Sequence, residues 1–575
     1  MTGSAEHMFG FLTSGTKEIV DPLVSVRSVS QWLRSLPVQD VIGRQQLVLG
    51  AFDTLRQPRR ALEPPRVQAV LFLDAALGAD RRQLVKQYVE NADSGTQLSQ
   101  RIWQAAFDLA QGYIGVYQQA LEQALAQGGN PRWKQLVPVL FARLTHYFGT
   151  DAKLRVFRFE RWIPAKWVEF HSIYMRAVEL ELDRVPTVLG HGPNTTQWTV
   201  EQEYVYALLI HQLNTGNMSP AELDWAFAQI RGWSRRLTLD AQARSMEGFI
   251  VDVSGKTGLS RPAGNDTGLM LRYLDTTPLA QHLDRAIAAL RHAEMPQRTS
   301  LPSINQRRVT ILEKLRPALA PTLNNNVRRD PRSACGTTAR VRVGLARISH
   351  ELASAKTRNM PPDDAGGHEK GPEQIEVYTI SDATPPRRHF RDEHDSIAAS
   401  LSSFTDPMWH VKDRSIAGLR IGATGGVGAA LTLGALVAVR QSDVSEWLLG
   451  VVRRLNKISP DEVEGGLAII ADNIVPVTLY TKRESKEDMG FVVDGVDVST
   501  IGARFEALYL PPPSRPDKPL MVKSIIVPTA EYDDGRSVIL TTGRSVYTIV
   551  LRHPIEQRAD WSWCAMQIAE KKSRT

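Results

Sequence analysis

The chain has 575 residues, and at roughly 150 residues per domain this length predicts several domains rather than one core. Hydrophobic residues make up 42% and charged residues 23%, a globular composition that excludes a disordered or collagen-like chain. Two cysteines exclude a disulfide framework and a short zinc motif, and the net charge of +7 is too mild an excess to identify a class of partner.

Residues 1–25 form an N-terminal tail that has no basic stretch followed by an apolar run. Such a pattern is required for a secretory signal. We therefore expect the protein to be cytoplasmic, which also suits its low cysteine content.

Residues 26–316 are expected to form an all-α N-terminal half, because apolar residues recur there at helical spacing. Ser219-Pro220-Ala221-Glu222 and Thr199-Val200-Glu201-Gln202 are capping boxes that mark two helix starts. Gly128-Gly129 ends an amphipathic helix that carries Ile102 to Ala124, and Pro164 opens a further helix. No fixed repeat period is visible, so an irregular helical bundle is predicted rather than a solenoid.

The histidines of this half, such as His146, His171 and His211, have no carboxylate or cysteine at metal-ligand spacing. We expect them to have packing or surface roles. The sequence predicts no metal site, no cofactor and no catalytic motif, so we do not expect an enzyme.

Residues 317–375 are expected to be a linker, partly disordered, because the stretch from Asn359 to Gly371 is polar and rich in proline and glycine. Charged and apolar residues alternate from Arg340 to Gly344, which indicates a short strand within the linker.

Beyond the linker the pattern becomes mostly β, and we divide it into residues 376–482 and a further β-rich segment, residues 483–575. Short runs of valine, isoleucine, leucine and tyrosine separated by turn residues predict the strands. The candidate strands are 436–439, 447–455, 467–470, 475–480, 524–527, 538–540 and 546–551.

Two short motifs in the first β segment suggest a binding site. Arg387 and Arg391 form an R-x-x-x-R pair, and Asp413, Ser415 and Gly418 form a D-x-S-x-x-G pattern. The combination resembles the PilZ domain, a family of bacterial receptors for cyclic di-GMP. The resemblance covers about residues 376–482 and implies a small antiparallel β-barrel that binds cyclic di-GMP through these five residues, with Arg388 as a possible additional contact.

The residue types fit that ligand, which carries two phosphates and two guanines. An arginine forks onto phosphate oxygens or onto the O6/N7 edge of guanine. Asp413 can accept from the N–H donors of the opposite guanine edge, and Ser415 is expected on the same face of a strand. Gly418 would allow a close backbone approach.

The resemblance therefore implies a cyclic di-GMP effector that passes a ligand-dependent conformational change to an unidentified protein partner, through the helical half. A PilZ-fold interaction protein without nucleotide binding is the alternative. A nucleic-acid binder that uses the arginines from Arg328 to Arg347 ranks lower, because aromatic residues are not interleaved there, and we expect no nucleic-acid polymer as partner.

Two further patterns have weaker interpretations. The uncharged run from Ile421 to Val439 has the nominal length of a membrane span, but glycines interrupt it, so we expect a loop and a buried strand rather than a membrane span. A second D-x-S-x-x-G match, from Asp497 to Gly502, has no arginine pair upstream, and we interpret it as turn and strand.

Overall fold

The structure is a computed structural model in which the chain divides into two compact units, Met1–Asn325 and Asn326–Thr575. Each unit is described by itself. The described residues are 21–37, 39–55, 62–92, 97–189, 197–213, 215–242, 247–262, 268–293, 303–322, 331–358, 409–424, 431–459, 462–482, 492–493, 496–497, 501–512, 523–541 and 545–573.

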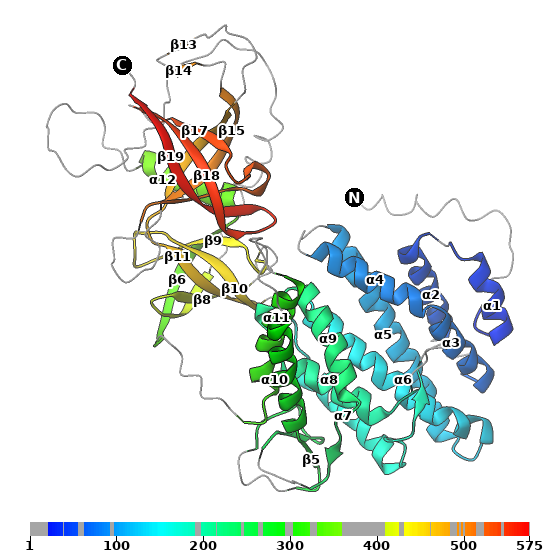
Figure 1. Cartoon of the computed structure of the whole chain (residues 1–575). Coiled ribbons are helices and arrows are strands. Elements are labelled where there is room, and N and C mark those ends of the chain that lie inside the picture. The colour runs from blue at the N-terminus through cyan, green and yellow to red at the C-terminus, as the bar shows by residue number, and fades with distance from the viewer. Residues whose placement is uncertain are drawn as a thin grey trace. The chain divides into compact units, whose positions relative to one another are not determined.

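The first unit is built of helices, as the sequence predicts (Figure 1). The two longest, α5 and α6, pack along one another, and α8 packs against α6. The helices are α1 (Val26–Ser35), α2 (Val41–Leu55), α3 (Pro64–Ala76), α4 (Gly78–Asn91), α5 (Gln97–Ala126), α6 (Pro131–Val156), α7 (Pro164–Glu179), α8 (Val200–Gln212), α9 (Pro220–Ser234), α10 (Thr277–His292) and α11 (Ile304–Leu319).

Local capping residues set several of these helix starts. The Ser219 side chain accepts from the Glu222 amide while the Glu222 side chain accepts from the Ser219 amide, and Thr199 and Gln202 repeat this exchange. Both predicted capping boxes are therefore confirmed. Pro164 occupies the first position of α7, where its missing N–H costs no helical hydrogen bond.

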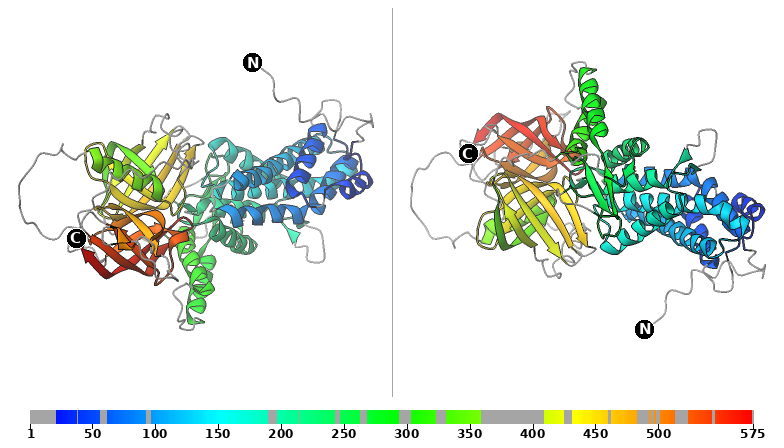
Figure 2. Two further views of the ribbon diagram at one scale, coloured as in Figure 1. Left: turned by 90° about the horizontal axis from the view of Figure 1, so that it is seen from above. Right: turned by 90° about the horizontal axis from the view of Figure 1, so that it is seen from below.

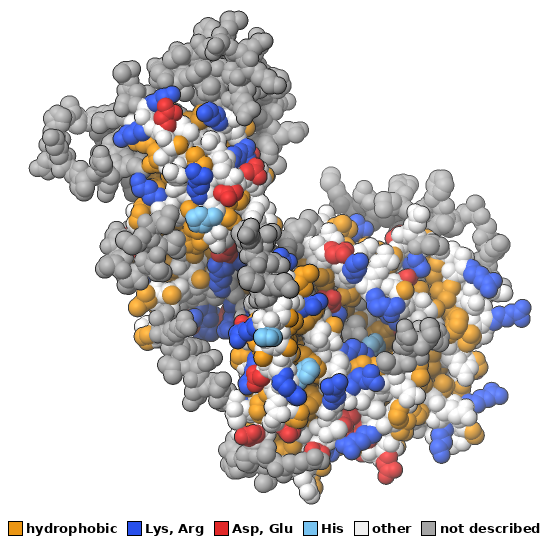
Figure 3. All heavy atoms as spheres, in the orientation of Figure 1, with side chains coloured by type: hydrophobic (Ala, Val, Ile, Leu, Met, Phe, Trp, Pro, Cys, Tyr) orange, Lys and Arg blue, Asp and Glu red, His pale blue; other side chains and the backbone are white. Residues whose placement is uncertain are grey.

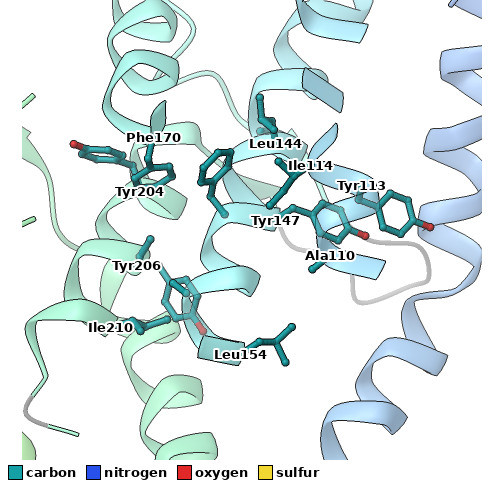
Figure 4. Close-up of a cluster of buried hydrophobic side chains, with 14 of the residues drawn as sticks. Ala110, Tyr113, Ile114, Leu144, Tyr147, Leu154, Phe170, Tyr204, Tyr206 and Ile210 are labelled. Carbon is teal, nitrogen blue, oxygen red and sulfur yellow. The ribbon is translucent and has the colours of Figure 1, made fainter. Parts of the chain in front are cut away.

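The core of the first unit is rich in aromatic side chains. Tyr113 of α5 stacks on Tyr147 of α6 with ring centroids 4.6 Å apart, and Tyr174 of α7 stacks on Tyr204 of α8 at 4.0 Å. Figure 4 shows Tyr147 beside Tyr113, and Tyr204 beside Phe170. All four tyrosines are buried, so the helices are held together by large apolar areas removed from water.

Small β elements complete the first unit. A three-stranded antiparallel sheet has the order β3–β5–β4. Two antiparallel strands of two residues each, β1 and β2, precede α8. The strands are β1 (Thr187–Val188), β2 (Gln197–Trp198), β3 (Leu239–Asp240), β4 (Phe249–Asp252) and β5 (Leu271–Leu274).

The second unit contains two closed antiparallel barrels. The first has the strand order β10–β11–β8–β7–β6–β9. Its strands are β6 (Ser333–Val343), β7 (Trp409–Arg414), β8 (Gly418–Thr424), β9 (Leu436–Gln441), β10 (Leu448–Ser459) and β11 (Glu462–Ala471).

The first barrel begins earlier than the sequence suggested. The range 317–375, expected to be a linker, contains β6, which pairs with β7 and β9 and closes the barrel, and also α12 (Leu345–Arg358). The alternation from Arg340 to Gly344 is the end of this strand. Its length was missed because its strand partners lie far away in the sequence, so no local pattern announces the pairing.

The second barrel has the order β12–β15–β16–β19–β18–β17. Its first strand takes residues 475–482, which the sequence places in the preceding domain, so the barrels divide at 472–474 and not at 482. The strands are β12 (Val475–Lys482), β15 (Ile501–Leu510), β16 (Ser524–Pro528), β17 (Ser537–Thr541), β18 (Ser545–Gln557) and β19 (Trp561–Ser573), and a hairpin of β13 (Val492–Val493) and β14 (Val496–Asp497) precedes β15.

The two barrels and α12 contribute buried side chains to one hydrophobic cluster, and the second barrel has a further interior cluster of its own. Leu436 of β9, Leu508 of β15, Trp561 of β19 and Ile348 of α12 are all buried in the same cluster. The two barrels therefore pack side by side within this unit (Figure 2). Polar contacts reinforce the contact, since the Trp561 indole donates to the Gly434 carbonyl at 3.2 Å.

The apolar end of the run from Ile421 to Val439 is β9, which contributes to this cluster. In β9, Leu436 and Ala438 face the cluster, and Val437 and Val439 lie on the opposite face, also buried, so both faces need apolar residues. Among the described residues, no helix combines the length and the hydropathy needed to cross a membrane.

Candidate functional site

The three residues of the D-x-S-x-x-G motif lie together where β7 turns into β8. Asp413 is near the end of β7, Ser415 follows that strand, and Gly418 is the first residue of β8. The Ser415 amide donates to the Gly418 carbonyl at 2.8 Å, and its hydroxyl donates to the same oxygen at 3.4 Å. The motif thus spans a tight turn between two strands, whereas the sequence interpretation placed Asp413 and Ser415 along one strand.

Gly418 is required here by a close approach of two backbones. A Cβ on this residue would lie 2.7 Å from the carbonyl oxygen of Leu467 in β11. Gly418 pairs with Ala468 of that strand, so a side chain would push β8 and β11 apart at their first pair. The glycine therefore permits the β8–β11 pairing that supports the turn.

Asp413 is the most strongly engaged member of the motif. Its Oδ1 atom accepts from Nη1 of Arg332 at 2.5 Å, and its Oδ2 atom lies 2.8 Å from Nε of Arg420. Arg332 directly precedes β6, and Arg420 is the cross-strand partner of Asp413 on β8. Only 15% of the Asp413 side chain is exposed, and the two arginine side chains are partly exposed.

Beside Asp413, Arg332 and Arg420 lies a second group of charged side chains. Nζ of Lys412 lies 3.2 Å from a carboxylate oxygen of Glu462 and also contacts Glu464. Hydrogen bonding to Glu464 raises the pKa of Lys412, so this ammonium remains charged at neutral pH. Its stem runs over Gly422, where a Cβ would lie 2.9 Å from Cε of the lysine.

Arg387, Arg388 and Arg391 lie outside the described residues. The structure therefore brings together the Asp413, Ser415 and Gly418 part of the predicted site. That the arginines contact the β7–β8 turn stays a prediction.

The two ends of the second D-x-S-x-x-G match lie in strands, since Asp497 ends β14 and Gly502 lies in β15, while residues 498–500 lie outside the described residues. A Cβ on Gly502 would lie 2.2 Å from the Thr481 hydroxyl oxygen, so this glycine also serves strand packing.

Sequence reasoning missed Arg332 and Arg420 as partners of Asp413. A signal for Arg420 existed, because a hairpin centred on 416–417 places residue 420 opposite residue 413. Arg332 is 81 residues from Asp413, and no local pattern connects them.

The buried charges of the helical unit have structural partners. Asp74 accepts from the hydroxyls of Tyr117 and Tyr147, each at 2.6 Å, and pairs with Arg81 and Arg143. Burial alone would raise the pKa of Asp74, but the two guanidinium groups and the hydroxyls outweigh burial and lower it.

The histidines have packing roles, as expected. His171 hydrogen-bonds to the Tyr204 hydroxyl and to the Thr257 carbonyl, and His146 contacts Glu203. Within the described ranges no group of histidine, cysteine, aspartate and glutamate could hold a metal ion.

Comparison with known families gives a match in the helical half. Residues 27–243 match the family model described as the N-terminal domain of the cyclic-di-GMP receptor FimW. The match ends before the barrels, so it is independent of the motif at the β7–β8 turn. No curated protein matches the chain.

Proposed function

We propose that this protein is a cyclic di-GMP receptor whose first barrel, a PilZ-like domain, binds the nucleotide. The observation that carries the proposal is that two separate parts of the chain indicate the same ligand. The helical half is similar to a domain of a cyclic di-GMP receptor, and the barrel carries Asp413, Ser415 and Gly418 at one corner.

The chemistry of the corner is that of binding rather than catalysis. Asp413 accepts from the N1 and N2 donors of one guanine, and Ser415 supplies a hydroxyl beside it. Arg387 and Arg391 fork onto the phosphates or onto the O6/N7 edge of a guanine. Contact between these arginines and the ligand would supply the conformational change that the receptor passes through its helical half to a protein partner.

The arginines of the region from Arg328 to Arg347 favour this proposal over nucleic-acid binding. Arg340 and Arg342 both pair with Glu351 of α12, and Arg332 pairs with Asp413. On the face seen in Figure 3, basic side chains are interspersed with acidic ones over the helical unit. A surface for phosphate backbones needs unneutralised arginine and lysine in a continuous stripe.

The test is calorimetric titration of the full chain with cyclic di-GMP. Asp413→Ala should weaken binding by about 10- to 100-fold, the range for hydrogen bonds to a charged group. Asp443→Ala is the matched control, because Asp443 is an exposed carboxylate on the same barrel between β9 and β10. Equal affinity of the two variants would refute the site, and a wild-type protein without affinity would leave the interaction-protein alternative.

A further inference from the structure

We propose that Arg332 occupies the guanine position on Asp413 in the nucleotide-free protein and that cyclic di-GMP must displace it. In this scheme Arg420 stays in place as a positioning residue for the Asp413 carboxylate. The inference rests on the proposed function and names two residues that set nucleotide affinity in opposite directions.

The guanidinium group of an arginine can take the place of guanine on a carboxylate. The Watson–Crick edge of guanine presents two N–H donors on a single N–C–N unit, and the guanidinium group of arginine presents the same arrangement. A carboxylate that accepts from the N–H donors of a guanidinium group also accepts from those of guanine. Arg332 donates to Oδ1 of Asp413 from Nη1 at 2.5 Å, the contact that a guanine donor would need.

Little of the Asp413 carboxylate is accessible while Arg332 and Arg420 are in place. With both arginines in place, only 15% of the Asp413 side chain is exposed. A guanine edge needs both carboxylate oxygens from one side, and it cannot reach them until one arginine leaves. Binding therefore requires an exchange of partners.

The backbone of Arg332 is held by fewer strand pairs than the backbone of Arg420. Arg420 lies within β8, is paired directly across from Asp413 and is held between β7 and β11. Arg332 stands outside the ladder, one residue before β6. After it only Ser333 and Ala334 pair with β7 before the register shifts, so its backbone is held by the end of a strand alone. Arg332 is the arginine that yields.

The displaced residue also belongs to the segment that joins the two units in sequence. The second unit begins at Asn326, six residues before Arg332. Exchange of Arg332 for guanine thus changes a contact that lies close in sequence to the border between the two units.

The test compares arginine variants of the full chain by calorimetric titration with cyclic di-GMP. Arg332→Ala should bind about two- to fivefold more tightly than wild type, because an exposed ion pair no longer competes. Arg420→Ala should bind more weakly, because the carboxylate loses its fixed orientation. Arg332→Lys should lie between wild type and Arg332→Ala, because a lysine keeps the charge but loses the planar guanidinium donors.

Arg340→Ala is the control, since Arg340 lies on β6, the strand that follows Arg332, and pairs with Glu351 instead of Asp413. Its affinity should match wild type. Unchanged or weaker binding by Arg332→Ala, in a wild-type background that binds, overturns the exchange while the proposed function stands. Absence of binding by both wild type and Arg332→Ala overturns the proposed function and the exchange with it.

Discussion

At the scale of single residues, the turn between β7 and β8 depends on the charge of Asp413 and on the absence of a side chain at Gly418. Asp413 has a guanidinium group at each oxygen, and Gly418 leaves room for the Leu467 carbonyl. The motif could be predicted from the sequence because its residues are close together in the chain. Arg332 could not, because its contact with Asp413 exists only after the barrel has closed.

Gly418→Ala should destabilise the protein by about 1–3 kcal/mol, the usual cost of overpacking, because the new methyl group meets backbone that cannot rotate away. Thermal or denaturant unfolding of the full chain measures this loss. Gly336→Ala is the matched control in β6, since nothing lies within 4 Å of its added Cβ. Equal stability of the two variants would show that β8 and β11 adjust freely at this point.

At the scale of elements, the helices were predictable where local chemistry marks their ends, as at the capping boxes of Ser219 and Thr199. Their packing was less accessible to sequence reasoning. Glu203 of α8 is fully buried and pairs with Arg231 of α9, and it also contacts His146 of α6. Only the folded arrangement of three helices places these groups together.

The Glu203 cluster should make the stability of the helical unit depend on pH. Burial alone would raise the pKa of Glu203, but the charges of Arg231 and His146 lower it to about 2. A carboxyl group with a lowered folded-state pKa stabilises the fold above its unfolded value, near 4.5, and this stability is lost as the pH falls towards 2.

Glu203→Gln is the variant that isolates this effect, because it keeps the shape and removes the charge. The free energy of unfolding of wild type should exceed that of the variant at pH 7, by on the order of 3 kcal/mol, and the difference should shrink between pH 4.5 and 2. Denaturant unfolding at a series of pH values gives both quantities. A difference that is independent of pH across this window would contradict the assigned pKa.

At the scale of the whole molecule, the order of helices before β structure was predictable, because the hydrophobic period changes along the chain. The borders of the barrels were not. β6 lies apart in sequence from β7 and β9, and α12 is buried against both barrels in a range that looks like linker. A fragment that starts near residue 370 would lack β6 and leave the first barrel open.

Because both barrels contribute to one hydrophobic cluster, they should unfold together. Trp561→Ala should destabilise both by about 3–5 kcal/mol, since a fully buried indole and its hydrogen bond to Gly434 are lost. Hydrogen exchange of β7–β8 and of β18–β19 at increasing denaturant follows the two barrels separately. Ile458→Ala, at an exposed position on β10, should change little. Persistent protection of β7–β8 after β18–β19 has opened would show that the barrels are independent.

The central claim is that Arg387 and Arg391 and the β7–β8 turn form one cyclic di-GMP site. Titration of the wild-type full chain and of its Arg391→Ala, Asp413→Ala and double variants with cyclic di-GMP tests it most directly. The account predicts saturable binding by wild type, a large loss of affinity in each single variant, and little further loss in the double variant, because both residues serve one ligand. Wild-type affinity in both single variants would contradict the account.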